Sequence, residues 1–118
     1  MARKGLDREQ ALAAKPEKMP VIKSEESEDG GLKLTVELTS RPLLGFIGGG
    51  YPVRRTFVLD VLGREVYEAC DGKSDVRHIV RKFAERHKIT LAEAEMSVTM
   101  FLKTLLSKNV VAIAIDRN

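Results

Sequence analysis

Three side chains of this sequence have the chemistry of soft metal ligands, nucleophiles or imidazole bases: Cys70, His78 and His87. Their spacings of eight and nine residues do not match a zinc site. Cys70 falls on the apolar side of a predicted helix, where a thiol is usually buried and inert. We therefore expect no catalytic residue, no metal ion and no cofactor, and a protein that is not an enzyme.

Four glycines, at positions 45, 48, 49 and 50, invite comparison with a phosphate-binding loop. Such a loop continues into a lysine with serine or threonine and opens a helix. Here Tyr51, Pro52 and a predicted strand follow instead. We interpret the segment as a flexible connection between two strands, and the role of its triple glycine, Gly48 to Gly50, stays open.

A basic stripe is predicted on one helix, where Arg77, Arg81 and Lys88 fall within a narrow arc. Such a stripe attracts phosphates or an acidic partner, although a solvated helix face is the plainer interpretation. The next helix would read DNA in a helix-turn-helix protein, but it contains no arginine and begins with Glu93 and Glu95. This argues against sequence-specific nucleic-acid binding and leaves the stripe as a candidate partner-facing surface.

Hydrophobic periodicity predicts the elements that position these residues. Strands are expected over 32–39, 53–59 and 110–115, and three helices between the last two. The helices begin after Asp60, Ser74 and Thr90, the last with a T-x-x-E capping box, and their apolar faces include Leu62 and Leu91. Three short helices with a small antiparallel sheet predict a winged-helix-like α+β domain.

Composition limits the class of protein further. The chain has 118 residues and one cysteine, with 43% apolar side chains and a net charge of +3. A disulfide framework and a membrane-spanning helix are both excluded, so we expect a cytoplasmic protein. Residues 1–30 hold two prolines and an acidic run, and predict a disordered or weakly helical charged tail before a domain over 31–118.

Two features of the predicted elements have no evident role in the hydrophobic core. Met96 and Met100 lie opposite the core stripe of the third helix, where methionines could pack against a partner. The strand over 53–59 could form a sheet edge that accepts an extended peptide. Packing of the methionines within the chain itself is an equally weighted alternative.

The stretch from Val53 to Val111 resembles the PqqD family. The residues that carry the resemblance are a strand, Leu59-Asp60 with Gly63, an aromatic residue at Tyr67, and Asp71-Gly72 before the second helix. The resemblance implies a winged-helix-like peptide-recognition domain without catalytic residues. Family members bind the leader region of a ribosomally made precursor peptide and present it to a radical S-adenosylmethionine enzyme, as in pyrroloquinoline quinone biosynthesis.

The resemblance also implies where the peptide binds, since it joins the sheet edge and lies near the third helix. On this chain the matching positions are Arg54, Thr56, Val58, Met96, Thr99, Met100 and Lys103. Two other functions stay open: a winged-helix nucleic-acid binder that uses Arg77, Arg81 and Lys88, and a structural homo-oligomer, such as a homodimer, built on the methionine surface.

Overall fold

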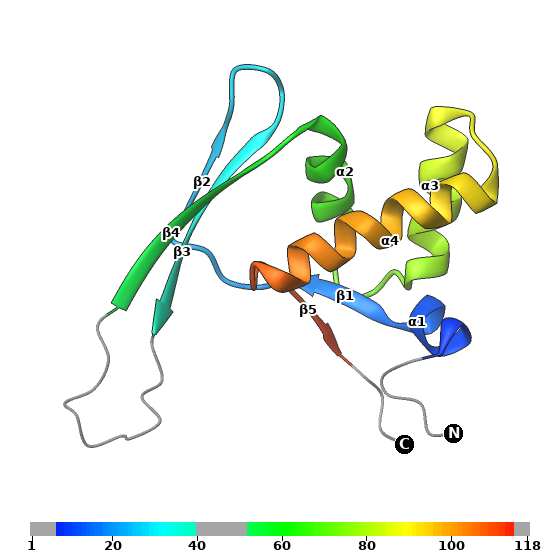
Figure 1. Cartoon of the computed structure of the whole chain (residues 1–118), viewed down its shortest axis with the longest axis horizontal. Helices are drawn as coiled ribbons and strands as arrows, with labels where there is room; N and C mark the ends of the chain where they lie inside the picture. Colours follow the sequence, from blue (N-terminus) through cyan, green and yellow to red (C-terminus); the bar gives the residue numbers. More distant parts are fainter. Residues whose placement is uncertain (1–6, 40–51, 115–118) are drawn as a thin grey trace. The chain divides into compact units, whose positions relative to one another are not determined.

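The computed structural model describes residues 7–39 and 52–114, and it shows an α+β protein (Figure 1). Its elements are α1 (Arg8–Ala13), β1 (Lys15–Lys18), β2 (Lys23–Glu26), β3 (Leu32–Thr39), β4 (Pro52–Leu59), α2 (Val61–Ala69), α3 (Val76–His87), α4 (Leu91–Ser107) and β5 (Val111–Ala114). The expected count of three helices is corrected to four within the described residues, because α1 adds one. The glycine loop and Ile115 lie outside the described residues.

The described residues form two compact units. One is Pro20–Arg64, and the other combines the residues before Pro20 with those from Glu65 onwards. The expected boundary at residue 30 therefore differs from the division in the structure. The junction between the two units, Arg64 to Glu65, lies within helix α2.

The unit Pro20–Arg64 holds an antiparallel sheet in the order β2-β3-β4. Strand β3 alternates as the sequence predicts. Leu32, Leu34 and Val36 are buried, whereas Lys33 and Glu37 are exposed. The alternation arises because successive side chains of a strand point to opposite faces. One face of the sheet is thus apolar and buried, and the other is polar.

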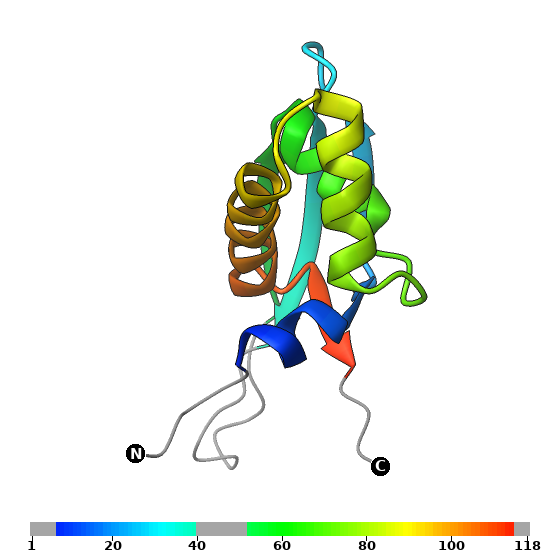
Figure 2. The same ribbon diagram turned by 90° about the vertical axis from the view of Figure 1, so that its right-hand side faces the viewer.

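In the second unit, α3 and α4 pack against each other, as Figure 2 shows. Helix α4 begins with the predicted capping box: Thr90 Oγ1 accepts from the Glu93 backbone N–H at 3.1 Å, and Glu93 Oε1 accepts from the Thr90 N–H at 3.0 Å. Helix α3 is capped by Asp75 rather than by the expected Ser74. The Ser74 hydroxyl lies one position before the cap and instead donates to the Asp71 carboxylate at 3.4 Å.

Residues 7–26 differ most from the expected tail. Asp7 and Gln10 form a capping box on α1, and β1 pairs antiparallel with β5, placing Pro16 opposite Ile113. Further on, β2 pairs with β3. Strands β1 and β2 carry mostly charged, exposed side chains, so no apolar pattern in the sequence predicts them. Strand β1 is ordered by backbone pairing with the distant β5, and β2 by pairing with β3 across a short turn, and the apolar pattern of neither strand indicates this.

Replacing Leu12 by alanine tests whether this N-terminal segment is part of the folded structure. Leu12 lies on α1 and is 4% exposed. A buried leucine truncated to alanine costs about 2 kcal/mol or more of unfolding free energy, whereas the same change in a disordered tail costs nothing. Urea denaturation measures the difference, and Leu91→Ala, at a leucine 58% exposed, is the matched control. Equal effects of the two substitutions would contradict the placement of α1.

Two core predictions on the helices are wrong. Leu62 is 38% exposed and Leu91 is 58% exposed, although both fall on the predicted apolar stripes. Each lies in the first turn of its helix, and the buried apolar side chains begin further along, at Val66 in α2 and Ala94 in α4. In the described part of the chain, no helix combines the length and apolar character needed to cross a membrane.

Candidate functional site

The outer edge of β4 presents backbone groups that β3 does not use. The Ile22 N–H donates to the Thr35 carbonyl at 2.8 Å, and the Ser27 N–H donates to the Gly31 carbonyl at 3.1 Å. The odd-numbered residues of β3 therefore face β2, and its even-numbered residues face β4, because backbone groups alternate in direction along a strand. The register pairs Thr35 with Thr56, so the Thr56 N–H and C=O point away from β3.

The same alternation applies to Arg54 and Val58, which pair with Glu37 and Lys33. Three of the predicted peptide-binding residues thus have their backbone groups on the open side of β4, the last strand of its sheet among the described residues. Such an edge is the structure to which an extended peptide adds a strand.

The side chains of these three β4 residues lie on the polar face of the sheet. All three are exposed, with Val58 at 62%. The Thr56 hydroxyl lies 3.3 Å from the Thr35 hydroxyl, and Arg54 stands opposite Glu37. The face therefore offers a cation, a hydroxyl and an apolar side chain at alternate positions of one strand.

The second group of predicted residues lies together along one face of α4. Met96 is 71% exposed and Met100 is 66% exposed, so of the two alternatives the exposed methionine surface is the one observed, and packing within the chain is not. They line an open groove of about 510 Å³ whose residues are Ala92, Glu95, Met96, Thr99, Met100 and Lys103. Flexible thioethers suit such a groove to apolar side chains of varied shape.

Glu95 is one of the residues that line this groove, and sequence reasoning assigned it no partner. The Arg8 guanidinium holds its carboxylate in a fork, with two N–O distances of 2.8 Å. This ion pair lowers the pKa of Glu95 and raises that of Arg8. Arg8 is 87 residues away in the sequence, so no local spacing could have indicated the pair.

The edge of β4 and the groove of α4 belong to different units of the chain. The structure groups Arg54, Thr56 and Val58 on one surface, and Met96, Thr99, Met100 and Lys103 on another.

The basic residues named from the sequence have different surroundings. Arg77 forms an ion pair with Glu9 of α1, with an N–O distance of 3.3 Å. Arg81 lines a separate hollow of about 200 Å³ beside Arg8 and Leu12. Lys88 follows the last residue of α3 in a left-handed conformation, with φ of 54°. Part of the positive charge of the predicted stripe is therefore balanced within the chain.

The three side chains with catalytic chemistry are not brought together. Cys70 is 0% exposed, its thiol donates to the Val66 carbonyl at 3.2 Å, and burial raises its pKa to about 12. His87 binds Glu65 at 2.8 Å, and His78 is exposed on α3. Within residues 7–39 and 52–114, no three His, Cys, Asp or Glu side chains cluster as metal ligands would.

These surfaces define a small α+β protein that offers an open strand edge and an exposed apolar groove. The model of the PqqD family, described as coenzyme PQQ synthesis protein D, matches residues 50–111, which is more than half of the chain. The chain therefore belongs to the PqqD family. Comparisons with curated proteins and with solved structures give no match.

Proposed function

We propose that this protein is a peptide-binding adaptor in coenzyme PQQ synthesis or in a related peptide-modifying pathway. It binds the leader region of a ribosomal precursor peptide and presents it to a radical S-adenosylmethionine enzyme. The observation that carries the proposal is the edge of β4, where Arg54, Thr56 and Val58 direct backbone donors and acceptors outward. Membership of the PqqD family supports the same assignment.

In this proposal the peptide adds a strand to β4, and its apolar side chains enter the groove of α4. Backbone hydrogen bonds at the edge supply affinity, and the groove at Met96 and Met100 supplies preference for apolar residues. The adaptor itself catalyses no step. It raises the effective concentration of the peptide beside its enzyme in the cytoplasm. A winged-helix-like arrangement of the helices and strands is part of the proposal.

A titration of the ¹⁵N-labelled full chain with the precursor peptide tests this function. We expect amide shifts along residues 54–58 and along 96–103. Shifts along both segments would support binding by strand addition beside the helix. A titration in which neither segment responds would refute the site assignment, and saturating, strongly salt-dependent binding of random duplex DNA at α3 would favour the nucleic-acid alternative instead.

Replacing Met100 by aspartate is expected to weaken peptide binding about tenfold, because burying a methionine side chain contributes roughly 1.5–3 kcal/mol. Met100 is 66% exposed, so the fold should tolerate the change. Isothermal titration calorimetry measures the affinity. Leu91→Asp is the matched control, since Leu91 is similarly exposed on the same helix but does not line the groove. A variant that binds as tightly as the parent would remove the groove from the site.

The same methionine surface could serve a homodimer, and the mass of the chain in solution distinguishes the two uses. A concentration-dependent mass that Met100→Asp abolishes, without any loss of peptide affinity, would favour self-association. A monomer at all concentrations would remove the structural homo-oligomer.

A further inference from the structure

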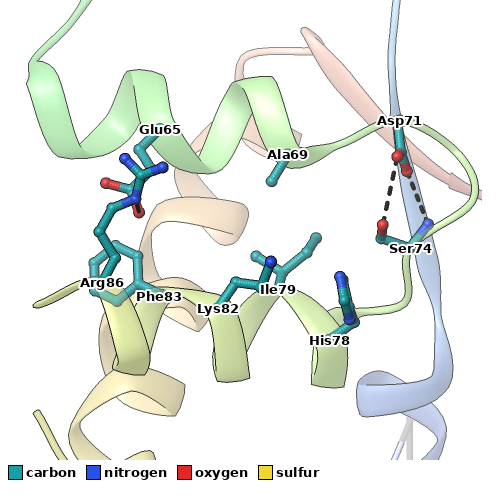
Figure 3. Close-up of a pocket in the computed structure, with 9 residues that line it drawn as sticks. All are labelled: Glu65, Ala69, Asp71, Ser74, His78, Ile79, Lys82, Phe83 and Arg86. Carbon is teal, nitrogen blue, oxygen red and sulfur yellow. Dashed lines mark hydrogen bonds and ion pairs between the residues drawn. The ribbon is translucent and has the colours of Figure 1, made fainter. Parts of the chain in front are cut away.

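A cleft between α2 and α3 shares no lining residue with the β4 edge or the α4 groove (Figure 3). Its volume is about 220 Å³, and all of its lining residues belong to one unit of the chain. Ala69 of α2 and the side chains of Ile79 and Phe83 of α3 supply its apolar lining. Lys82 and His78 extend from α3 toward the same space, as Figure 3 shows.

The negative charges of this cleft already have partners. Glu65 lies 2.8 Å from His87 and 3.7 Å from Arg86. Asp71 accepts the backbone N–H groups of Ser74 and Lys73, each at 2.8 Å, and these bonds lower its pKa. Both carboxylates are therefore compensated by groups of the chain itself.

Two basic side chains of the cleft have no such partner among the described residues. The side chains of Lys82 and His78 form no hydrogen bond or ion pair in the part of the chain that the structure describes, although the His78 backbone N–H donates to Asp75, and both residues are exposed. They stand four residues apart, which places them on the same face of α3. The cleft thus combines an apolar lining with two donors that are free to bind an anionic group.

The size of the cleft indicates what could enter it. Small-molecule and cofactor pockets occupy about 300–1,000 Å³, which is more than the 220 Å³ found here. A single apolar side chain of another protein is a better match for that volume. Carboxylates next to that side chain would meet Lys82 and His78.

We propose that the cleft between α2 and α3 is a docking site for an acidic segment of a partner protein, with one apolar side chain as its anchor. The anchor contacts Ala69, Ile79 and Phe83, and flanking carboxylates accept from Lys82 and His78. Its lining residues are distinct from those of the β4 edge and the α4 groove, so the proposal stands whether or not those surfaces bind a peptide.

Titration of the ¹⁵N-labelled full chain with a five-residue peptide, four glutamates around a central leucine, tests this site. We expect shifts at the amides of Ala69, Ile79 and Lys82 at millimolar peptide, and weaker binding when alanine replaces the leucine. Lys82→Gln should weaken binding about fivefold, the upper range for an exposed ion pair. Thermal unfolding checks that the variant is folded.

Arg81→Gln is the matched control, because it removes the same charge from the adjacent position of α3, outside the cleft. An unchanged affinity for Arg81→Gln supports the cleft. An equal loss in both variants would show attraction to the whole helix and overturn the proposal. The absence of shifts at the cleft would also overturn the proposal. The same conclusion would follow if inorganic phosphate or random duplex DNA shifted the same residues and Lys82→Gln weakened those shifts equally.

Discussion

Replacing Thr56 by proline is expected to weaken binding of the precursor peptide about 100-fold, because proline lacks the N–H and its ring blocks the added strand. The Thr56 N–H points away from β3, so the substitution removes no backbone hydrogen bond of the native sheet, although it does remove the contact between the Thr56 and Thr35 hydroxyls. Proline is tolerated on edge strands at such outward positions. Isothermal titration calorimetry with the precursor peptide measures the loss.

Two variants separate the backbone effect from other causes. Thr56→Ala keeps the N–H and removes the hydroxyl, and it should change affinity by less than about threefold, in line with the modest net value of an exposed hydrogen bond. Ser24→Pro makes the same backbone change on β2, the opposite edge of the same sheet, where Ser24 also faces outward. If Ser24→Pro and Thr56→Pro reduced affinity equally, strand addition at β4 would be excluded.

The thiol of Cys70 is expected to react with a disulfide reagent about a thousandfold more slowly in the native protein than in the urea-unfolded protein. Burial raises its pKa from an ordinary 9.0 to about 12, and the thiolate is the reactive form. Cys70 is the only cysteine of the sequence, so the released chromophore reports this residue alone. Native and unfolded rates within tenfold of each other would contradict its burial in the core.

The same pKa change makes stability depend on pH. The pKa of Cys70 is higher in the folded protein than in the unfolded protein. The free energy by which this difference stabilises the folded state is therefore fully present below pH 9. As the pH rises from about 9 to about 12, the unfolded thiol ionises while the folded thiol stays protonated, and the unfolding free energy falls. Cys70→Ala should remove that part of the slope, which urea denaturation at several pH values measures.

Those parts of the fold that have strong local signals were predicted well. The capping box at Thr90 and the apolar spacing after it located α4, and alternation located β3 over 32–39. The strand predicted over 53–59 matches β4 to within one residue. Asp60 accepts the Gly63 N–H at 2.7 Å, as a cap of α2 should. In each case the residues that determine the element lie within a few positions of one another.

Features that depend on distant partners were not visible in the sequence. Strand β1 contains a proline and three charged residues, and only its pairing with β5 makes it a strand. The ion pairs of Arg8 with Glu95 and of Arg77 with Glu9 likewise join residues far apart in the chain. Likewise, the direction of the β4 backbone groups required the register of two neighbouring strands.

The pairing of β1 with β5 sets an order of events during synthesis. Its closest register partners, Lys18 and Val111, are separated by more than ninety residues. At about 5–20 residues per second on the ribosome, the nascent β1 has no partner strand for roughly 5–20 s. The sheet β2-β3-β4 comes from one contiguous stretch, so it can assemble on the ribosome before β5 is synthesised, whereas β1 can pair only after that point.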